Sequence, residues 1–214
     1  MIKTIHDLLV TYENYADPIG KTNREIKNGN LFPIVKGLYE TDINTPGLFL
    51  SAYIYGPSYL SFEYALYYHG LIPEKVTVFT NATFKKQRSK KYKNSFGVFT
   101  YRDIPQNAYP YGVKAYINNG YSYIIASPEK ALCDRLYIAQ PQTSMKDLKV
   151  LIFENLRISE ETFLELNFGD LLFLCDKYRS TNMRLLKRII IKETMNHDHP
   201  RANDWKLFYK YSRW

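Results

Sequence analysis

The sequence predicts an α+β fold, because helical and extended patterns occupy different stretches of the chain. Apolar residues recur at helical spacing near the N-terminus and again from residue 127 onward. Between these stretches, segments within 76–126 alternate between apolar and polar residues as strands do. Strands grouped in this way favour antiparallel pairing over repeated β-α-β units. We therefore expect a central antiparallel sheet flanked by helices and an all-helical C-terminal part.

Residues 1–42 are predicted to form a short winged-helix-like unit. Residues 4–15 place apolar side chains at helical spacing, and Asp17-Pro18 begins a second helix, at 18–28, that Gly29 ends. Residues 31–39 fit two short strands around a tight turn at Lys36-Gly37. Two helices followed by a β-hairpin match a winged helix-turn-helix that lacks one helix. We assign residues 43–214 to a second, α+β domain with a helical C-terminal extension.

The elements of this second domain follow from caps and alternation. Helices are predicted at 46–55 and 61–69, the latter with Ser61 as its N-cap and Gly70 after its end. After an extended pair at 59–60, strands are predicted at 76–80, 83–87, 96–102, 112–117 and 121–126. Helices follow at 128–138, 144–154, 159–167, 168–178 and 182–195. The tail 196–214 is mixed, and its two tryptophans are available to fold back on the body.

Composition indicates a globular protein of the cytoplasm. Apolar residues make up 45% of the chain and charged residues 23%, close to the values of ordinary globular domains. No apolar run approaches the roughly 18 residues of a membrane span, and the first residues lack the plan of a signal peptide. Cys133 and Cys175 stand alone within apolar helical patterns, so we expect two reduced, buried thiols.

The net charge of +8 is concentrated in one stretch. Residues 81–115 carry eight basic side chains and one acidic side chain, whereas residues 1–40 carry five of each. A field as local as this predicts an acidic partner. Its densest part, within 84–93, has six cations and no acid: Lys85, Lys86, Arg88, Lys90, Lys91 and Lys93.

Three interpretations of this basic segment remain open. Lysines and arginines contact phosphates, and the interleaved Phe84 and Tyr92 could stack on exposed bases. An acidic protein partner would use the same charges. Alternatively, a solvated hairpin rich in lysine keeps a sheet edge from pairing with other chains.

The second predicted helix carries side chains that suit DNA recognition. Amide, hydroxyl and cationic groups of this kind contact bases and phosphates from a recognition helix, with one further lysine at the tip of the wing. These candidate DNA-binding residues are Lys21, Thr22, Asn23, Arg24, Lys27, Asn28 and Lys36. The unit has no net charge, however, so an ordinary helical cap on the sheet domain is the alternative.

Signatures of catalysis are missing from the sequence, so we predict a binding protein without a cofactor rather than an enzyme. There is no Gly-rich phosphate loop, no Cys-x-x-Cys and no His-Glu-x-x-His spacing. His197 and His199 supply only two potential ligands, which is too few for a zinc site. A nuclease or nucleotidyltransferase without a recognisable signature remains the third alternative.

Residues 127–136 begin a helix in a way that needs no functional explanation. Ser127 caps the helix, Pro128 occupies its first turn and Glu129 suits its dipole. Lys130 and Asp134 are four residues apart and can pair on one face. The alternative is a polar site that Glu129, Lys130 and Asp134 form together with Glu63 or His69.

Three segments together resemble the AbiEi family of antitoxins of bacterial type IV toxin–antitoxin and abortive phage-infection systems. They are 31–39 with Lys36-Gly37-Leu38-Tyr39, 59–72 with Leu60-Ser61-Phe62-Glu63, and 125–134 with Ser127-Pro128-Glu129-Lys130. The resemblance covers roughly residues 23–137, and the basic region lies between the second and third segments. Positions that match the family motif are Ser61, Glu63, Ala65, His69, Gly70, Glu129, Lys130, Ala131 and Asp134.

This resemblance implies a two-part regulator. An N-terminal winged helix would bind operator DNA and repress its own operon, with the DNA-reading residues in 21–28 and Lys36 in the wing. The second domain would counteract a cognate toxin, a nucleotidyltransferase-like protein. The short, neutral N-terminal unit departs from the family pattern, and the helices after residue 137 are not matched to it in detail. The alternative is a protein-interaction module whose basic surface binds an acidic partner without binding DNA.

Overall fold

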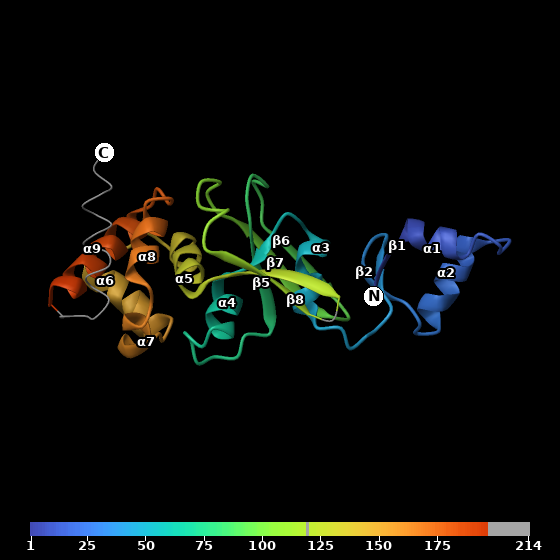
Figure 1. Ribbon diagram of the computed structural model, residues 1–214, viewed down its shortest axis with the longest axis horizontal. Coiled ribbons are helices and arrows are strands. Elements are labelled where there is room, and N and C mark those ends of the chain that lie inside the picture. Colours follow the sequence, from blue (N-terminus) through green and yellow to red (C-terminus); the bar gives the residue numbers. More distant parts are fainter. Residues whose placement is uncertain (119, 197–214) are drawn as a thin grey trace.

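The computed structural model describes residues 1–118 and 120–196, which form an elongated molecule of three successive parts (Figure 1). A small N-terminal unit occupies one end, a six-stranded sheet the middle, and a group of helices the other end. The α+β fold predicted from the sequence is confirmed. Among the described residues, no helix has both the length and the apolar character needed to cross a membrane.

The N-terminal unit combines two helices with a three-stranded antiparallel sheet. Its elements are β1 (Ile2–Thr4), α1 (Ile5–Thr11), α2 (Pro18–Lys27), β2 (Phe32–Val35) and β3 (Leu38–Glu40), and its sheet has the order β1-β3-β2. Thr4 and Asp7 form a capping box at the start of α1, and Asp17 accepts a hydrogen bond from the Gly20 N–H (2.8 Å) at the start of α2. Strand β1 was not predicted, because three residues are too few to show alternation.

The central sheet is mixed, so the prediction of an antiparallel sheet was wrong in this respect. Its order is β6-β7-β5-β4-β9-β8, with β4 (Tyr59–Leu60), β5 (Val78–Thr83), β6 (Lys90–Asn94), β7 (Gly97–Asp103), β8 (Val113–Asn118) and β9 (Tyr121–Ala126). Strand β5 is parallel to β7, and β4 is parallel to β9. The first parallel pair arises because β6 lies outside β7 as its hairpin partner, so that β7 returns beside β5 in the same direction.

The strand predicted at 83–87 is also wrong. Lys85 and Gln87 each have a φ of 56°, which ends the extended conformation after β5. The carboxylate of Asp103 holds this loop by accepting hydrogen bonds from the backbone N–H groups of Lys86 (2.6 Å) and Gln87 (2.7 Å). The following basic residues form strand β6, which was not predicted.

Helices cover the sheet and then continue beyond it. The 3-10 helix η1 (Gly47–Leu50), α3 (Ser51–Ile54) and α4 (Phe62–Tyr68) precede or interrupt the strands. The predicted helix 46–55 is thus split in two, as is 144–154, which becomes α6 (Met145–Lys149) and the π-helix η2 (Val150–Asn155). The other C-terminal helices are α5 (Pro128–Tyr137), α7 (Glu160–Leu164), α8 (Phe168–Cys175) and α9 (Thr181–Asn196). The tail residues 197–214 lie outside the described residues.

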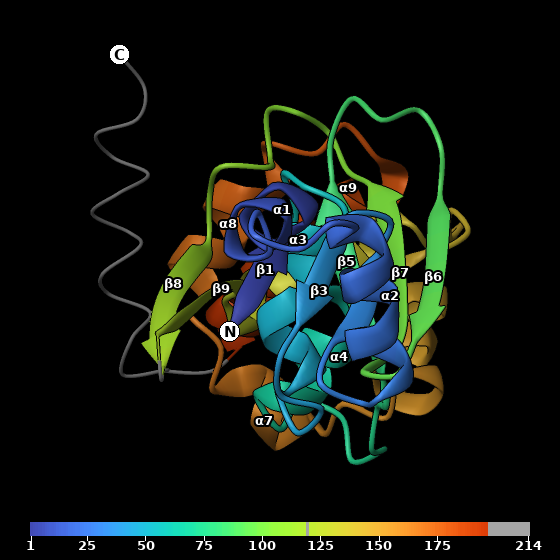
Figure 2. The same ribbon diagram turned by 90° about the vertical axis from the view of Figure 1, so that its right-hand side faces the viewer.

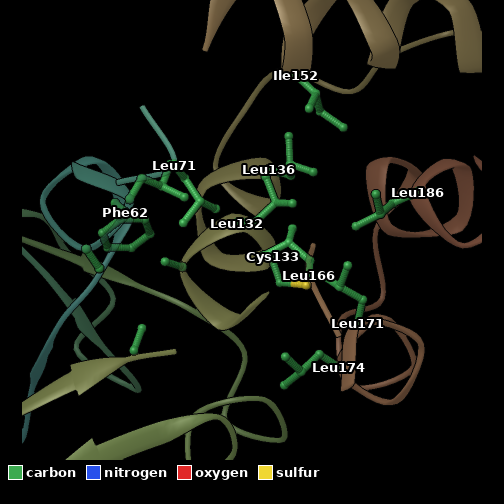
Figure 3. Packing of buried hydrophobic residues seen from close by; sticks show 14 of the residues in the cluster. Phe62, Leu71, Leu132, Cys133, Leu136, Ile152, Leu166, Leu171, Leu174 and Leu186 are labelled. Atoms are coloured by element: carbon green, nitrogen blue, oxygen red, sulfur yellow. The ribbon is translucent and has the colours of Figure 1, made fainter. Parts of the chain in front are cut away.

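Helix α5 is the centre of the larger hydrophobic core. Figure 3 shows Leu132 and Leu136 of α5 between Phe62 on the sheet side and Leu186 of α9 on the helical side. Cys133 lies in this core too, and both it and Cys175 are buried free thiols, as predicted. Burial of the α5 side chains therefore joins the sheet to the C-terminal helices.

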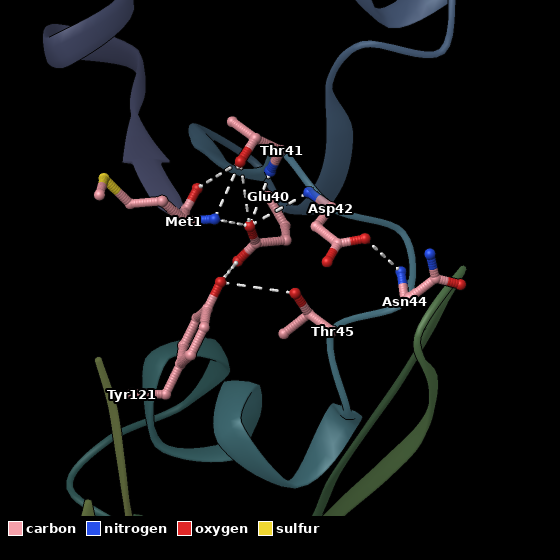
Figure 4. Close-up of polar contacts among 7 residues, drawn as sticks. All are labelled: Met1, Glu40, Thr41, Asp42, Asn44, Thr45 and Tyr121. Atoms are coloured by element: carbon pink, nitrogen blue, oxygen red, sulfur yellow. Dashed lines mark hydrogen bonds and ion pairs between the residues drawn. The ribbon is translucent and has the colours of Figure 1, made fainter. Parts of the chain in front are cut away.

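The N-terminal unit is fastened to the sheet by a smaller apolar cluster and by Glu40. Ile34 of β2 packs with Phe96 and Phe99 at the β6–β7 hairpin. The fully buried Glu40 forms an ion pair with the α-amino group of Met1 and accepts a hydrogen bond from the Tyr121 hydroxyl (2.9 Å; Figure 4). Burial alone would raise the pKa of Glu40, but these donors together with nearby backbone N–H groups hold the pKa below its ordinary value.

Candidate nucleic-acid interface

Strand β6 presents lysines along one edge of the central sheet. The side chains of Lys91 and Lys93 are exposed, whereas Tyr92 between them is half-buried, in the alternation that a strand imposes. The Tyr92 ring lies against Tyr55 and Tyr101, with centroid distances of 6.2 and 5.8 Å. This aromatic ring therefore packs inward, and the expectation that it stacks on bases is not supported by its position.

The loop before β6 carries the remaining cations. Lys85 and Arg88 are exposed, while the Lys86 ammonium donates to the Gly56 carbonyl (2.9 Å) and lies 4.9 Å from the centre of the Tyr55 ring. Phe84 packs on Tyr109 at 4.3 Å between centroids, so this ring also faces the body.

None of the six basic side chains within 84–93 pairs with a carboxylate in the described part of the chain. The one acidic residue of the stretch, Asp103, is occupied by the hydroxyl of Thr83 and the loop N–H groups. Within 1–118 and 120–196, the positive field of β6 and its loop is consequently not neutralised by an ion pair.

Helix α2 and its C-cap expose four of the predicted DNA-binding side chains, namely Asn23, Arg24, Lys27 and the capping Asn28. The other two on this helix are committed to internal contacts. Thr22 is 2% exposed, and its hydroxyl donates to the Pro18 carbonyl (3.0 Å). Lys21 forms an ion pair with Glu25 and lies over the ring of Tyr15.

The predicted wing residue Lys36 is exposed at the β2–β3 turn. Gly37 beside it has a φ of 80°, and its carbonyl accepts a hydrogen bond from the N–H of Ile5 (2.8 Å), which ties the turn to the start of α1. The hairpin lies between α2 and the sheet along the long axis of the molecule (Figure 1). In the end-on view of Figure 2, α2 and β6 lie toward the same side.

Three of the six polar or charged motif residues, Ser61, Lys130 and Asp134, meet in a closed polar cluster. Asp134 accepts hydrogen bonds from the hydroxyls of Ser61 (2.6 Å), Tyr59 (2.9 Å) and Tyr178, and its Oδ1 lies 3.2 Å from the Lys130 ammonium. Lys130 also donates to the Ala108 carbonyl (2.8 Å) and to Tyr178. The side chains of Lys130 and Asp134 have no exposed surface.

Burial is the main cause of the pKa shifts of Lys130, Tyr59 and Tyr178. It lowers the pKa of Lys130 against the opposing effect of Asp134, and it raises the pKa of Tyr59 and Tyr178, with the Asp134 charge acting in the same direction on both tyrosines. Because the cluster is closed to solvent, its role is structural. It holds β4, α5 and the segment after α8 together. Ser61 occupies the N-cap position of α4, but its hydroxyl donates to Asp134 rather than capping the helix as predicted.

The other three polar or charged motif residues, Glu63, His69 and Glu129, each contact a neighbouring element singly. Nε of Arg135 lies 2.8 Å from the Glu63 carboxylate, so α4 and α5 are linked. His69 contacts the Ala126 carbonyl through Nε2 (2.7 Å), and Glu129 accepts from the Asn167 N–H (3.0 Å). The structure therefore does not bring Glu63, His69 and the Lys130–Asp134 pair into one polar site.

A groove of about 640 Å³ opens in the C-terminal helices, with Phe153 and Ile189 in its wall. Its other lining residues include both lysines and glutamates, so its charge is mixed.

No group of three or more His, Cys, Asp or Glu side chains is placed to hold a metal ion within 1–118 and 120–196. His197 and His199 lie outside these residues.

Tyr59 and Tyr178 are the cluster members that sequence reasoning missed. Tyr178 is 44 residues from Asp134, and nothing in the local pattern relates the two.

No protein-family model matches this sequence, and a search of curated proteins finds no match either.

Proposed function

We propose that this protein is a DNA-binding antitoxin of the AbiEi type, which represses its own operon and counteracts a nucleotidyltransferase-like toxin. In this proposal it acts by binding rather than by catalysis. The support comes from two exposed surfaces and from the three sequence segments that resemble the family.

The observation that carries the proposal is the unneutralised charge of β6 and its loop. Lys91, Lys93 and Arg88 are exposed and have no carboxylate partner in the described part of the chain. Cations that neutralise phosphates release condensed counterions, which supplies most of the affinity of non-specific DNA binding. A row of lysines on a rigid strand is suited to this contact because the strand fixes their spacing.

Helix α2 supplies the second surface. Arginine and asparagine side chains hydrogen-bond to guanine and adenine edges in the major groove. Arg24 and Asn23 are exposed and of these types, and Lys27 and Asn28 extend the same exposed region. In this proposal α2 reads bases, while Lys36 and the lysines of β6 contact the sugar-phosphate backbone on either side.

A gel-shift titration with the DNA upstream of the protein's own gene tests this function. We expect a specific shift, weakened about tenfold or more by Arg24→Ala, since a good bidentate base contact contributes about 1–3 kcal/mol. Lys75→Gln, which removes an exposed lysine from the loop before β5, is the matched control and should bind as the wild type does. Absence of a shift at low salt would remove the DNA-binding part of the proposal.

The antitoxin part has a separate test. Co-expression with the product of the adjacent nucleotidyltransferase-like gene should restore growth. Arg24→Ala should retain this protection, because α2 lies far from α5, the helix that carries Lys130 and Asp134 (Figure 1). Failure of the wild-type chain to protect would contradict the antitoxin role while leaving DNA binding intact.

The alternative is an interaction module for an acidic protein partner. It is favoured by the position of β6 at a sheet edge, where an extended acidic segment could add as a further strand. Changing Lys85, Lys86, Lys90 and Lys91 to Glu would then abolish protection from the toxin without altering DNA affinity. Loss of both properties together would support phosphate contact by β6 instead.

A further inference from the structure

The two edges of the central sheet have opposite character. Three of the five residues of β6 are lysines, which is a common protection of an edge strand against pairing with another chain. Strand β8, at the other edge, has the sequence Val-Lys-Ala-Tyr-Ile-Asn, with a single charge. Among the described residues its one strand neighbour is β9.

The β8–β9 hairpin also exposes large apolar side chains. Ile117 is 84% exposed, the highest value of any large apolar residue in the described chain, and Tyr116 and Ile124 are 38% and 39% exposed. Ala115 is cross-strand to Ile124, so Ile117 and Ile124 are diagonal neighbours on one face. In Figure 2, β8 lies at the left margin of the sheet, outside β9.

The backbone of β8 is arranged to accept a further strand. Ser127 donates its N–H to the Gly112 carbonyl (2.7 Å), which marks residues 112 and 127 as a hydrogen-bonded pair of the β8–β9 ladder. Hydrogen-bonded and non-hydrogen-bonded pairs alternate in an antiparallel ladder. Val113, Ala115 and Ile117 therefore direct their N–H and C=O groups toward the open edge.

We propose that β8 pairs antiparallel with β8 of a second copy of this chain and so forms a homodimer with a continuous twelve-stranded sheet. A two-fold axis between the two Tyr116 residues places Ala115 opposite Ile117 of the second copy. The outward backbone groups of one strand then meet those of the other.

Charge supports a second copy as the occupant of this edge. In the proposed register the two Lys114 residues are four positions apart, or about 13 Å at roughly 3.3 Å per residue, which exceeds the screening length at physiological salt. The same pairing at β6 would set lysines opposite or diagonal to one another, which is unfavourable. The self-association of this chain is thus expected at β8 and not at β6.

Sedimentation velocity of the full chain tests the proposal. We expect a mass of twice 25.2 kDa and a dissociation constant raised at least tenfold by Ile117→Lys. Val10→Lys, at a side chain that is 55% exposed on α1, is the matched control and should leave the dimer unchanged. Both positions are exposed, so circular dichroism should show a native fold in each variant.

The register has its own test by oxidative cross-linking. Tyr116→Cys should form a disulfide-linked dimer, because residues at the two-fold axis bring their Cα atoms to about 4.5–5.5 Å. Lys114→Cys, on the same face of the same strand, should not. A wild-type chain that stays monomeric up to about 100 µM, an equal effect of Ile117→Lys and Val10→Lys, or equal cross-linking at 114 and 116 would overturn the proposal.

Discussion

Replacing Asp134 by alanine should be among the most destabilising single changes in this protein. The change leaves the Lys130 ammonium without its carboxylate, and the hydroxyls of Tyr59, Ser61 and Tyr178 without their common acceptor. Removing one member of a buried ion pair typically costs about 3–5 kcal/mol, and each unsatisfied buried donor adds to the cost. Since a domain is stable by about 5–15 kcal/mol, the loss would consume a large part of the total.

The double change Lys130→Met with Asp134→Leu separates charge from packing. It removes both charged groups and fills their space with apolar side chains. We therefore expect the double variant to be at least about 2 kcal/mol more stable than Asp134→Ala. Glu74→Ala, in the exposed Arg157–Glu74 ion pair, is the control and should cost no more than about 1 kcal/mol.

Urea unfolding followed by circular dichroism gives the free energies of unfolding for these variants. We expect a midpoint for Asp134→Ala well below that of the wild type, with partial recovery in the double variant. If Asp134→Ala cost less than about 1 kcal/mol, the buried pair would not hold the elements together, and additive effects in the double variant would show that the two residues act independently.

Three further predictions concern other parts of the molecule. Tyr121→Phe removes a hydrogen bond to the buried carboxylate of Glu40 and should cost about 1.5–3 kcal/mol in thermal or urea unfolding; an unchanged midpoint would contradict this. Burial raises the pKa of Tyr64 to about 12, so the stability that its neutral hydroxyl contributes is fully present below pH 10, the ordinary pKa, and is lost as the pH rises toward 12. The absorbance at 295 nm of the wild type and of Tyr64→Phe should therefore differ as the pH approaches 12. A difference near pH 10 instead would refute the shift. Arg24→Ala should weaken DNA binding without lowering the melting temperature, whereas Thr22→Val, at a 2% exposed position, should lower the melting temperature; the reverse pattern would mean that the exposed and buried faces of α2 are misassigned.

The fold class and most helices could be predicted because their signals are local. Ser127 and Pro128 mark the start of α5 through a cap and a fixed φ, and the structure places them there. Asp17 does the same for α2. Such signals depend on neighbouring residues alone, so they survive in the folded chain.

Strand β6 and the sheet order could not be predicted in the same way. The inward side chains of β6 are Lys90, Tyr92 and Asn94, so the strand shows no apolar alternation, and its pairing with β7 supplies the hydrogen bonds that define it. The parallel pairs of the sheet likewise depend on contacts between segments far apart in the chain.

The exposure and contacts of the candidate site residues could be predicted in part. Residue type and helical position selected the exposed Asn23, Arg24, Lys27 and Asn28, but not the contacts that occupy Lys21 or the burial of Thr22. The pairing of Lys130 with Asp134 followed from their spacing of four residues. Its completion by Tyr178 depends on the packing of α5 against the C-terminal helices, which no local pattern contains.

The most direct test of the central claim is the salt dependence of binding to the upstream DNA, measured by fluorescence anisotropy. The proposal predicts that the logarithm of the binding constant falls linearly with the logarithm of salt concentration. Changing Lys91 and Lys93 to Gln should make the slope shallower by about 1.8, or about 0.9 for each lost phosphate contact. A slope that these two changes leave unaltered, or the absence of salt-dependent binding by the wild-type chain, would contradict the assignment of β6 as a phosphate-binding surface.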